Sequence, residues 1–392
     1  MDTPKDNTQP MQKPDPKILS HLIDTGELSE FLQEMQIDPQ TADDNQRVRA
    51  MSMHQLDPDL GWPRLIRNTQ IYESMPSVNL IVEGIPVRLD MNPGRAASIR
   101  SSAFEKNGET CFLCELDEGQ RGVTILDDRY IVLANPGITI PGDLTISATR
   151  HEKQILDGHF GDLLAIARRL YDYSIYYNGA MAGASSPHFH FQGGLKNRLP
   201  GERQIQSLPT GKDSGNTSLL SLIDRPDIEV YALHEFSRSA FLARSSDVAE
   251  FRRFLEYFYR QLAEVDRDIV NFPNVPDFGR RVNSIEINEN EGRMNIMLQF
   301  EPGNGEYLAV FFTKLFNRPG CYFREENRIL IGMAIKEALG VIITCRDEDF
   351  DQLRNHPEWI AEARRDTSLP PAMEKKLETA IRRYPLRNSI QQ

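Results

Sequence analysis

The sequence has few cysteines, no long apolar run and no excess of basic residues, and each shortage excludes a class of protein. Its 392 residues include four cysteines, Cys111, Cys114, Cys321 and Cys345, which are too few to brace a chain of this length with disulfides. No stretch approaches the roughly 18 consecutive apolar residues that span a bilayer, so no membrane partner is expected. The formal net charge is −12, with lysine and arginine scattered, so no nucleic-acid partner is expected either.

The length and the pattern of apolar residues predict two domains or one duplicated domain. Residues 1–16 are polar and proline-rich without the apolar core of a signal peptide, and we expect a disordered lead-in to a cytoplasmic protein. Strand and helix patterns at 17–200 recur in the same order at 226–365. Between them, 201–225 reads as a linker or excursion, and 366–392 as an exposed helix or tail. The fold class expected is therefore α+β.

The stretch "SSPHFHFQGG" carries the clearest chemical pattern. His188, His190 and Gln192 recur every second residue, as side chains on one face of a strand do, while Phe189 and Phe191 fall on the opposite face. We expect the aromatic residues to pack into a core and the polar row to face a cleft. The alternative is a strand with two incidental histidines.

An imidazole in a cleft can act as a nucleophile towards phosphorus, because its neutral form carries a free ring nitrogen near neutral pH. The small residues before His190, including Gly183, allow close backbone approach to a phosphate, and Ser185 and Ser186 offer hydroxyl donors. Gln192 can donate a hydrogen bond but cannot deliver a proton to a leaving group or activate water. The pattern therefore favours transfer of a phosphoryl group to an acceptor over hydrolysis.

Cys111 and Cys114 form a close pair, and His151 and His188 follow it. Two thiolates and two imidazoles are the ligand set of a tetrahedral zinc site, which with four protein ligands would be structural. The alternatives are a redox-active pair, or ordinary core thiols beside a surface histidine. The spacing alone does not decide among them, because it is far longer than in a zinc finger.

The segment "GAMAGASSPHFHFQ" resembles the active-site segment of the histidine-triad superfamily in its transferase branch. That branch includes galactose-1-phosphate uridylyltransferase, diadenosine tetraphosphate phosphorylase and GDP-galactose phosphorylase. The wider layout, with "CFLC" and "ITCRDEDF", most resembles a group of bacterial phosphorylase-like proteins. Phe189 stands where the uridylyltransferases have proline, so their sugar-nucleotide specificity is not carried over.

The resemblance implies a fold of two histidine-triad-like halves, with antiparallel sheets and helices packed on one face. It implies that His190 becomes covalently nucleotidylated and that Gln192 steadies this intermediate. It also implies a structural Zn²⁺ held by Cys111, Cys114, His151 and His188. Further nucleotide contacts are expected at Asn135, in the segment "ANPGITIPGDLTIS", and at Asn178.

The function expected is nucleotidyl transfer from a nucleotide sugar or dinucleoside polyphosphate to phosphate or a sugar 1-phosphate. Arg95 and Arg100 lie in a Gly/Ser loop and could clamp phosphates with their planar guanidinium groups. Lys314, Arg318 and Arg346 are interpreted as members of surface ion pairs. A nucleotide hydrolase and a non-catalytic nucleotide-binding scaffold stay open as alternatives, and the chain is expected to act alone or as a homodimer.

Overall fold

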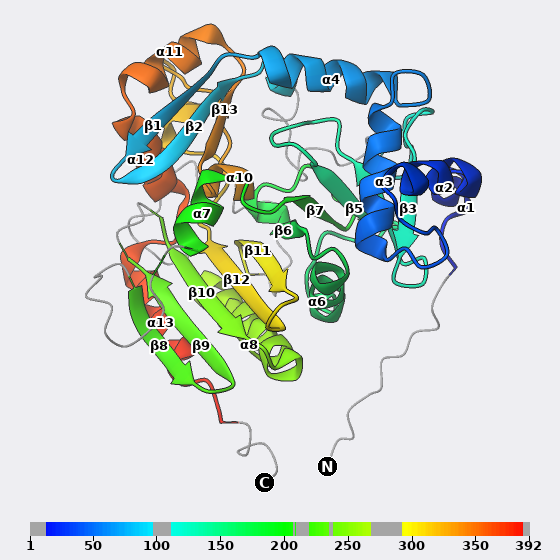
Figure 1. Cartoon of the computed structure of the whole chain (residues 1–392). Coiled ribbons are helices and arrows are strands. Elements are labelled where there is room, and N and C mark those ends of the chain that lie inside the picture. The colour runs from blue at the N-terminus through cyan, green and yellow to red at the C-terminus, as the bar shows by residue number, and fades with distance from the viewer. Residues whose placement is uncertain are drawn as a thin grey trace.

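A ten-stranded antiparallel sheet runs through the molecule (Figure 1). The computed structural model describes residues 13–96, 111–206, 208, 219–234, 238–267 and 292–386. The first half supplies β3 (Gly122–Ile125), β4 (Tyr130–Ala134), β5 (Leu144–Ala148), β6 (Tyr173–Asn178) and β7 (His190–Leu195). The second half supplies β8 (Leu219–Arg225), β9 (Ile228–Leu233), β10 (Ala240–Ser245), β11 (Met294–Glu301) and β12 (Glu306–Thr313).

The two halves have the same connectivity. The sheet order is β3-β4-β5-β7-β6-β11-β12-β10-β9-β8, so from either edge the strands of each half follow in the order first, second, third, fifth, fourth. Each half places its helix, α6 (Phe160–Arg169) or α8 (Val248–Arg267), between its third and fourth strands. The halves meet where β6 pairs with β11, with Asn178 opposite Asn295. They differ in the next connection, because β6 and β7 are joined by residues 179–189 whereas β11 and β12 are joined by 302–305 alone.

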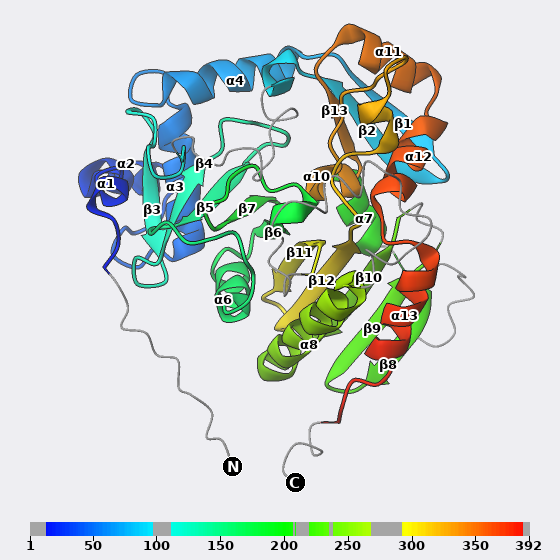
Figure 2. The ribbon, with the colours of Figure 1, turned by 180° about the vertical axis from the view of Figure 1, so that it is seen from behind.

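One face of the sheet is covered by helices (Figure 2). Alternate strand residues such as Ile296 and Leu298 point into this core, where they meet Leu163 of α6 and Phe254 of α8. Further helices pack on the same core, namely α2 (Thr25–Glu34), α3 (Asp44–Leu56), α4 (Pro63–Ser74) and α13 (Pro371–Ile381). The short helix α1 (Pro16–Leu19) adds Ile18 to a small separate cluster with Ile131 and Leu133.

The other face is covered in its central part by a second core. Met297 and Tyr176 point to this side and pack with residues of α7 (Pro200–Gln206), α10 (Ile335–Ala338) and a small sheet. That sheet has the order β1-β2-β13, with β1 (Ser77–Val82), β2 (Ile85–Met91) and β13 (Val341–Thr344). Helices α11 (Asp347–Asn355) and α12 (Glu358–Thr367) lie beside it (Figure 1). The small sheet joins segments from both ends of the chain, since β2 and β13 pair in parallel.

The expected α+β class with antiparallel sheets and helices on a face is confirmed. The C-terminal segment forms the helix α13 but is not exposed throughout, because Met373, Leu377 and Ile381 make an apolar stripe that packs into the core. The stretch 201–225 contains most of α7 and all of β8. Among the described residues, no helix combines the length and apolar character needed to cross a bilayer.

Candidate functional site

The polar row of "HFHFQ" lies near the centre of the first half's sheet. β7 pairs with β5 on one side and β6 on the other, with His190 opposite Ser147 and Gln192 opposite Thr145. Phe189 and Phe191 are fully buried in the main core, in contact with each other. The aromatic residues therefore hold the strand from behind, as the two-residue period predicts, and His190 and Gln192 face a cavity on the other side.

The ring of His190 is held in one tautomer by the backbone. Its Nδ1 lies 2.8 Å from the carbonyl oxygen of His188, and since a carbonyl can only accept, Nδ1 carries the proton. The lone pair is therefore on Nε2. Burial lowers the pKa of His190, with the His188 carbonyl opposing this in part, so the ring is neutral near pH 7.

Gln154, which no sequence pattern singled out, fixes the strand that carries His190. Its Oε1 accepts the backbone N–H of His190 at 2.8 Å, and its Nε2 donates to the carbonyl oxygens of Asn178 and His190 at 2.9 and 3.1 Å. The side chain is buried. It thus joins the end of β6 to the start of β7 across the intervening loop. No local motif marks it, because its partners lie 24 and 36 residues away.

A cavity of about 590 Å³ opens in front of His190 and Gln192. Five of the expected nucleotide contacts line it: Arg95, Asn135, Asn178, Gly183 and Ser185. Arg95, at the end of the short helix η1 (Pro93–Arg95), is held there because its Nη1 donates to the carbonyl oxygen of Gly137 at 2.7 Å. Gly183 has φ +106° and follows the short helix η2 (Ala180–Ala182), so the loop turns where glycine is favoured.

Of the two other expected contacts, Ser186 is placed elsewhere. Ser186 is buried, and its hydroxyl accepts the backbone N–H of His188 at 3.2 Å and lies 3.8 Å from the sulfur of Cys111. It therefore supports the cysteine and histidine cluster instead of facing the cavity. Arg100 lies outside the described residues.

The second half closes the cavity with residues that, apart from Arg318, the sequence patterns did not mark. Residues 332–337, with Asn317 and Arg318, line it. Lys336 is buried there, with its Nζ 2.5 Å from Asp143 Oδ1 in the loop before β5. Asp143 Oδ2 in turn accepts the backbone N–H and the hydroxyl of Thr139, both at 2.7 Å. This ion pair fixes the N-terminal end of α10 against the first half.

The interpretation of three second-half cations as surface ion pairs holds for one of them. Arg346 pairs with the exposed Glu348 at 2.7 Å and also with the buried Asp349 at 2.6 Å. Arg318 instead lines the cavity and lies over the ring of Tyr322, with 5.0 Å between guanidinium carbon and ring centroid. Lys314 is only 3% exposed. It follows β12, whose end is covered by residues from α12, so a position that looks terminal in the sequence is interior in the fold.

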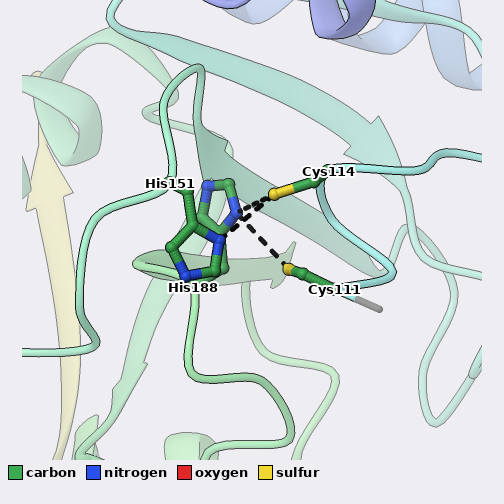
Figure 3. Close-up of side chains that lie close together, drawn as sticks. All are labelled: Cys111, Cys114, His151 and His188. Atoms are coloured by element: carbon green, nitrogen blue, oxygen red, sulfur yellow. Dashed lines mark hydrogen bonds between the residues drawn. The ribbon is translucent and has the colours of Figure 1, made fainter. Parts of the chain in front are cut away.

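Cys111, Cys114, His151 and His188 come together as one cluster (Figure 3). One ligand atom from each lies within 4.8 Å of all the others. Cys114 Sγ is 3.1 Å from His151 Nδ1 and 3.4 Å from His188 Nδ1, and Cys111 Sγ is 3.6 Å from His188 Nδ1. The two cysteines come from one turn, His151 follows β5, and His188 precedes β7, so separate segments of the first half converge here.

The donor atoms of this cluster fit a soft divalent metal ion. His188 Nε2 lies 2.9 Å from the carbonyl oxygen of Ala148, which places the proton on Nε2 and leaves the Nδ1 lone pair facing the sulfurs. Burial lowers the pKa of His188 to about 4 and, together with the neighbouring Cys111 thiol, raises the pKa of Cys114 to about 12. A bound cation would reverse the thiol shift, because it stabilises the thiolate.

Comparison with known proteins finds a family match to part of the chain and similar solved structures. Residues 57–195 match the family described as "Domain of unknown function (DUF4922)". The chain is also similar to the crystal structure of yeast Ap4A phosphorylase Apa2, with 12% identity and a TM-score of 0.47 over 78% of this chain and 94% of that one. Its complexes with AMP (14% identity, TM-score 0.44) and with Ap4A (13%, 0.43) also cover 78% of this chain, and 95% and 96% of theirs. No curated protein matches the sequence.

Proposed function

We propose that this protein is a phosphorylase-type nucleotidyltransferase that works through a covalent nucleotidyl-histidine at His190. One observation carries the proposal: the ring of His190 faces a cavity with its Nε2 lone pair available, because Nδ1 donates to the carbonyl of His188. In the first half-reaction Nε2 attacks the α-phosphorus, a P–N bond forms, and the P–O bond to the leaving group breaks. In the second, an oxygen of the acceptor attacks the same phosphorus and His190 is released.

Two arginines in the cavity lining support a phosphorylated substrate. Arg95 of the first half and Arg318 of the second line one cavity, beside the carboxylates of Glu115, Asp117 and Glu337, and a planar guanidinium group can bind a phosphate through paired hydrogen bonds. Phe112, whose side chain is exposed, also lines the cavity and offers an apolar ring face for a base. A dinucleoside polyphosphate such as Ap4A or a nucleotide sugar would be the donor, and inorganic phosphate or a sugar 1-phosphate the acceptor.

The polar residue two positions after the nucleophile supports transfer over hydrolysis. Gln192 lies beside His190 at the cavity, and its amide can donate to a phosphate oxygen but carries no titratable proton. Water is therefore given no general base at this position, whereas an acceptor phosphate brings its own negative oxygen. A hydrolase of the same superfamily is the alternative that the experiment below separates.

We also propose that Cys111, Cys114, His151 and His188 hold a structural Zn²⁺. The ion would bring four protein ligands together and leave no position for substrate, so it would brace the start of β7 without taking part in the chemistry. His188 would then serve twice, since its side chain is a ligand and its carbonyl orients His190.

The experiment is to mix the purified protein with α-³²P-labelled Ap4A, ATP and nucleotide sugars and to isolate the protein under denaturing conditions. We expect a label that is labile to acid and stable to base, as a phosphoramidate is. Addition of inorganic phosphate should discharge the label into a nucleoside diphosphate faster than water does. His190→Ala should remove the label, while His356→Ala, at an exposed histidine, should keep it.

Three results would contradict the proposal. A label that survives His190→Ala would place the covalent chemistry elsewhere. Nucleotide binding without label or turnover across the panel would favour the non-catalytic scaffold, and turnover that phosphate does not accelerate would favour the hydrolase.

A further inference from the structure

Two buried amide side chains, those of Asn178 and Asn295, link the candidate catalytic residue Gln192 to the second half. Asn295, in β11, donates from Nδ2 to Asn178 Oδ1 at 2.6 Å, and Asn178, at the end of β6, directs Nδ2 at Gln192 Oε1 at 3.5 Å. Asn295 is fully buried and Asn178 nearly so. The row therefore crosses the junction of the two halves and ends at the cavity.

The direction of each amide in this row is fixed by its neighbours. Asn295 Nδ2 faces two oxygens, Asn178 Oδ1 and the carbonyl oxygen of Ala182, at 2.6 and 2.7 Å. A reversed Asn295 would point its own oxygen at both, which is repulsive in a buried site. Asn178 Oδ1 also accepts the backbone N–H of Ile335 at 3.0 Å, so Asn178 cannot reverse without losing two donors.

The hydrogen-bonded row of Asn295, Asn178 and Gln192 determines whether the amide nitrogen or the amide oxygen of Gln192 points away from Asn178. Since Asn178 offers an N–H, Gln192 directs Oε1 at it, and the planar amide then places Nε2 at its other corner. A donor facing the cavity stabilises the negative charge of a phosphoryl group in transfer, whereas a carbonyl oxygen in the same place would repel it.

We propose that Asn295 is a positioning residue that holds Gln192 in its donor orientation through Asn178. The inference rests on the proposed nucleotidyl transfer and adds that the second half participates in it without touching the reacting atoms. The N-terminal end of α10 belongs to the same arrangement, because the backbone of Ile335 is the second donor to Asn178. The orientation of the amide in the first half is thus set by groups more than 100 residues away in the chain.

The test is a double-mutant cycle on the rate of His190 labelling from α-³²P-labelled Ap4A at saturation. Asn295→Ala should lower the maximal rate about tenfold and leave the half-saturating concentration within about twofold, since the donor acts on developing charge. In a Gln192→Ala background, Asn295→Ala should have no further effect on the rate. Asn295→Ser is a milder truncation of the same position, should Asn295→Ala not fold.

Gln299→Ala is the matched control. Gln299 lies on the same strand, is also buried, and donates to Ser174 Oγ of β6 at 2.7 Å, away from the cavity. It should lower stability to a similar degree and leave the labelling rate unchanged. Equal effects of Asn295→Ala in the wild-type and Gln192→Ala backgrounds, or none in the wild type, would overturn the inference.

A measurement without turnover separates this inference from the proposed function. In the ¹⁵N spectrum of selectively glutamine-labelled protein, the Gln192 side-chain amide pair is the one missing in Gln192→Ala. Asn295→Ala should shift that pair, and Gln299→Ala should not. Absence of labelling in the wild type would overturn the proposed function, whereas an unshifted Gln192 pair would overturn the amide row itself.

Discussion

His190 owes its tautomer, with the proton on Nδ1, to a backbone carbonyl two residues away, and the loop before it owes its shape to a glycine. Gly183 combines a left-handed backbone with a close neighbour, since an added Cβ would lie 2.8 Å from Ala334 Cβ at the start of α10. The loop that precedes His190 and the segment that closes the cavity therefore touch at a position with no room for a side chain. Conformation and close packing both require glycine here.

Gly183→Ala should lower the free energy of unfolding by about 2–3 kcal/mol, because it combines backbone strain of about 1 kcal/mol with overpacking against Ala334. Gly84→Ala is the matched control. Gly84 also has a positive φ, +77°, but an added Cβ there would meet nothing within 4 Å, so this substitution should cost about 1 kcal/mol. Urea denaturation of both variants measures the difference, and equal losses would show that the contact with Ala334 costs nothing.

Lys314 gives stability a pH dependence. Burial, with Arg238 and Arg364 nearby, lowers its pKa to about 7, although Glu337 opposes the shift. The unfolded chain, with the ordinary pKa near 10.5, takes up a proton as the pH falls from about 10.5 towards 7 while the folded chain does not. The contribution of Lys314 to stability is therefore present above pH 10.5 and is lost as the pH falls through 7.

Lys314→Met should accordingly raise the free energy of unfolding at pH 7 by about 2 kcal/mol, a value below the full linkage because buried sites relax. The gain should shrink as the pH approaches about 10. Thermal unfolding of both proteins between about pH 6.5 and 10 measures this trend. A gain that grows with pH would show that the ammonium group is stabilised in the folded protein.

At the scale of elements, the start of β7 is fixed by the cysteine turn on one side and by Gln154 on the other. Cys111→Ser should remove one metal ligand and lower the melting temperature by about 10 °C or more, since structural zinc contributes directly to folding. Metal analysis should give about one zinc per chain in the wild type and much less in the variant. At low temperature, labelling of His190 in the variant should fall only in proportion to the fraction of the protein that is folded.

Cys345→Ser is the control for the loss of a thiol. Cys345 also carries a reduced thiol, buried beside β13 and remote in sequence from the cluster. The variant should keep the full zinc content. A wild-type protein that contains no zinc after purification in zinc-supplemented medium, and that melts unchanged after chelation, would contradict the metal proposal.

Some elements could be predicted from the sequence because their signals are local. The alternation in "HFHFQ" predicts the strand, the buried face and the polar face, and the spacing of apolar residues predicts α6 and α8. The small sheet could not be predicted, because its parallel pair joins Arg88 and Val341, and nothing near either residue specifies the partner. "GVIITC" reads equally well as a strand of the second half.

At the scale of the molecule, the pairing of β6 with β11 makes one sheet and one main core from both halves. The halves should therefore unfold together. Trp62 reports on the first half and Trp359, in α12, on the far side of the molecule, so Trp62→Phe and Trp359→Phe variants isolate each probe. In urea the two fluorescence midpoints and the far-ultraviolet circular dichroism midpoint should coincide.

Leu298→Ala tests the same point by perturbation. Leu298 is fully buried in β11, opposite Ile175 of β6, and its truncation should lower the free energy of unfolding by about 2–4 kcal/mol. Both tryptophan midpoints should move by the same amount. Separate midpoints, or a shift in one alone, would show that the halves are independent folding units.

The site itself was predictable on the side that lies within one segment. His190 and Gln192 lie in β7 and His188 lies two residues before its start, so a spacing of two residues identifies all three. Lys336 and Asn295 were missed, because they reach Asp143 and Asn178 across 193 and 117 residues of chain. Such contacts are determined by how the halves pack, and a lone lysine or asparagine in an apolar segment carries no sign of them.

The short hairpin at 302–305 occupies, in the second half, the place that the 179–189 loop takes in the first. The loop of this hairpin is too short to bind a phosphate beside a second histidine. Exhaustive labelling should therefore saturate at a single nucleotide per polypeptide.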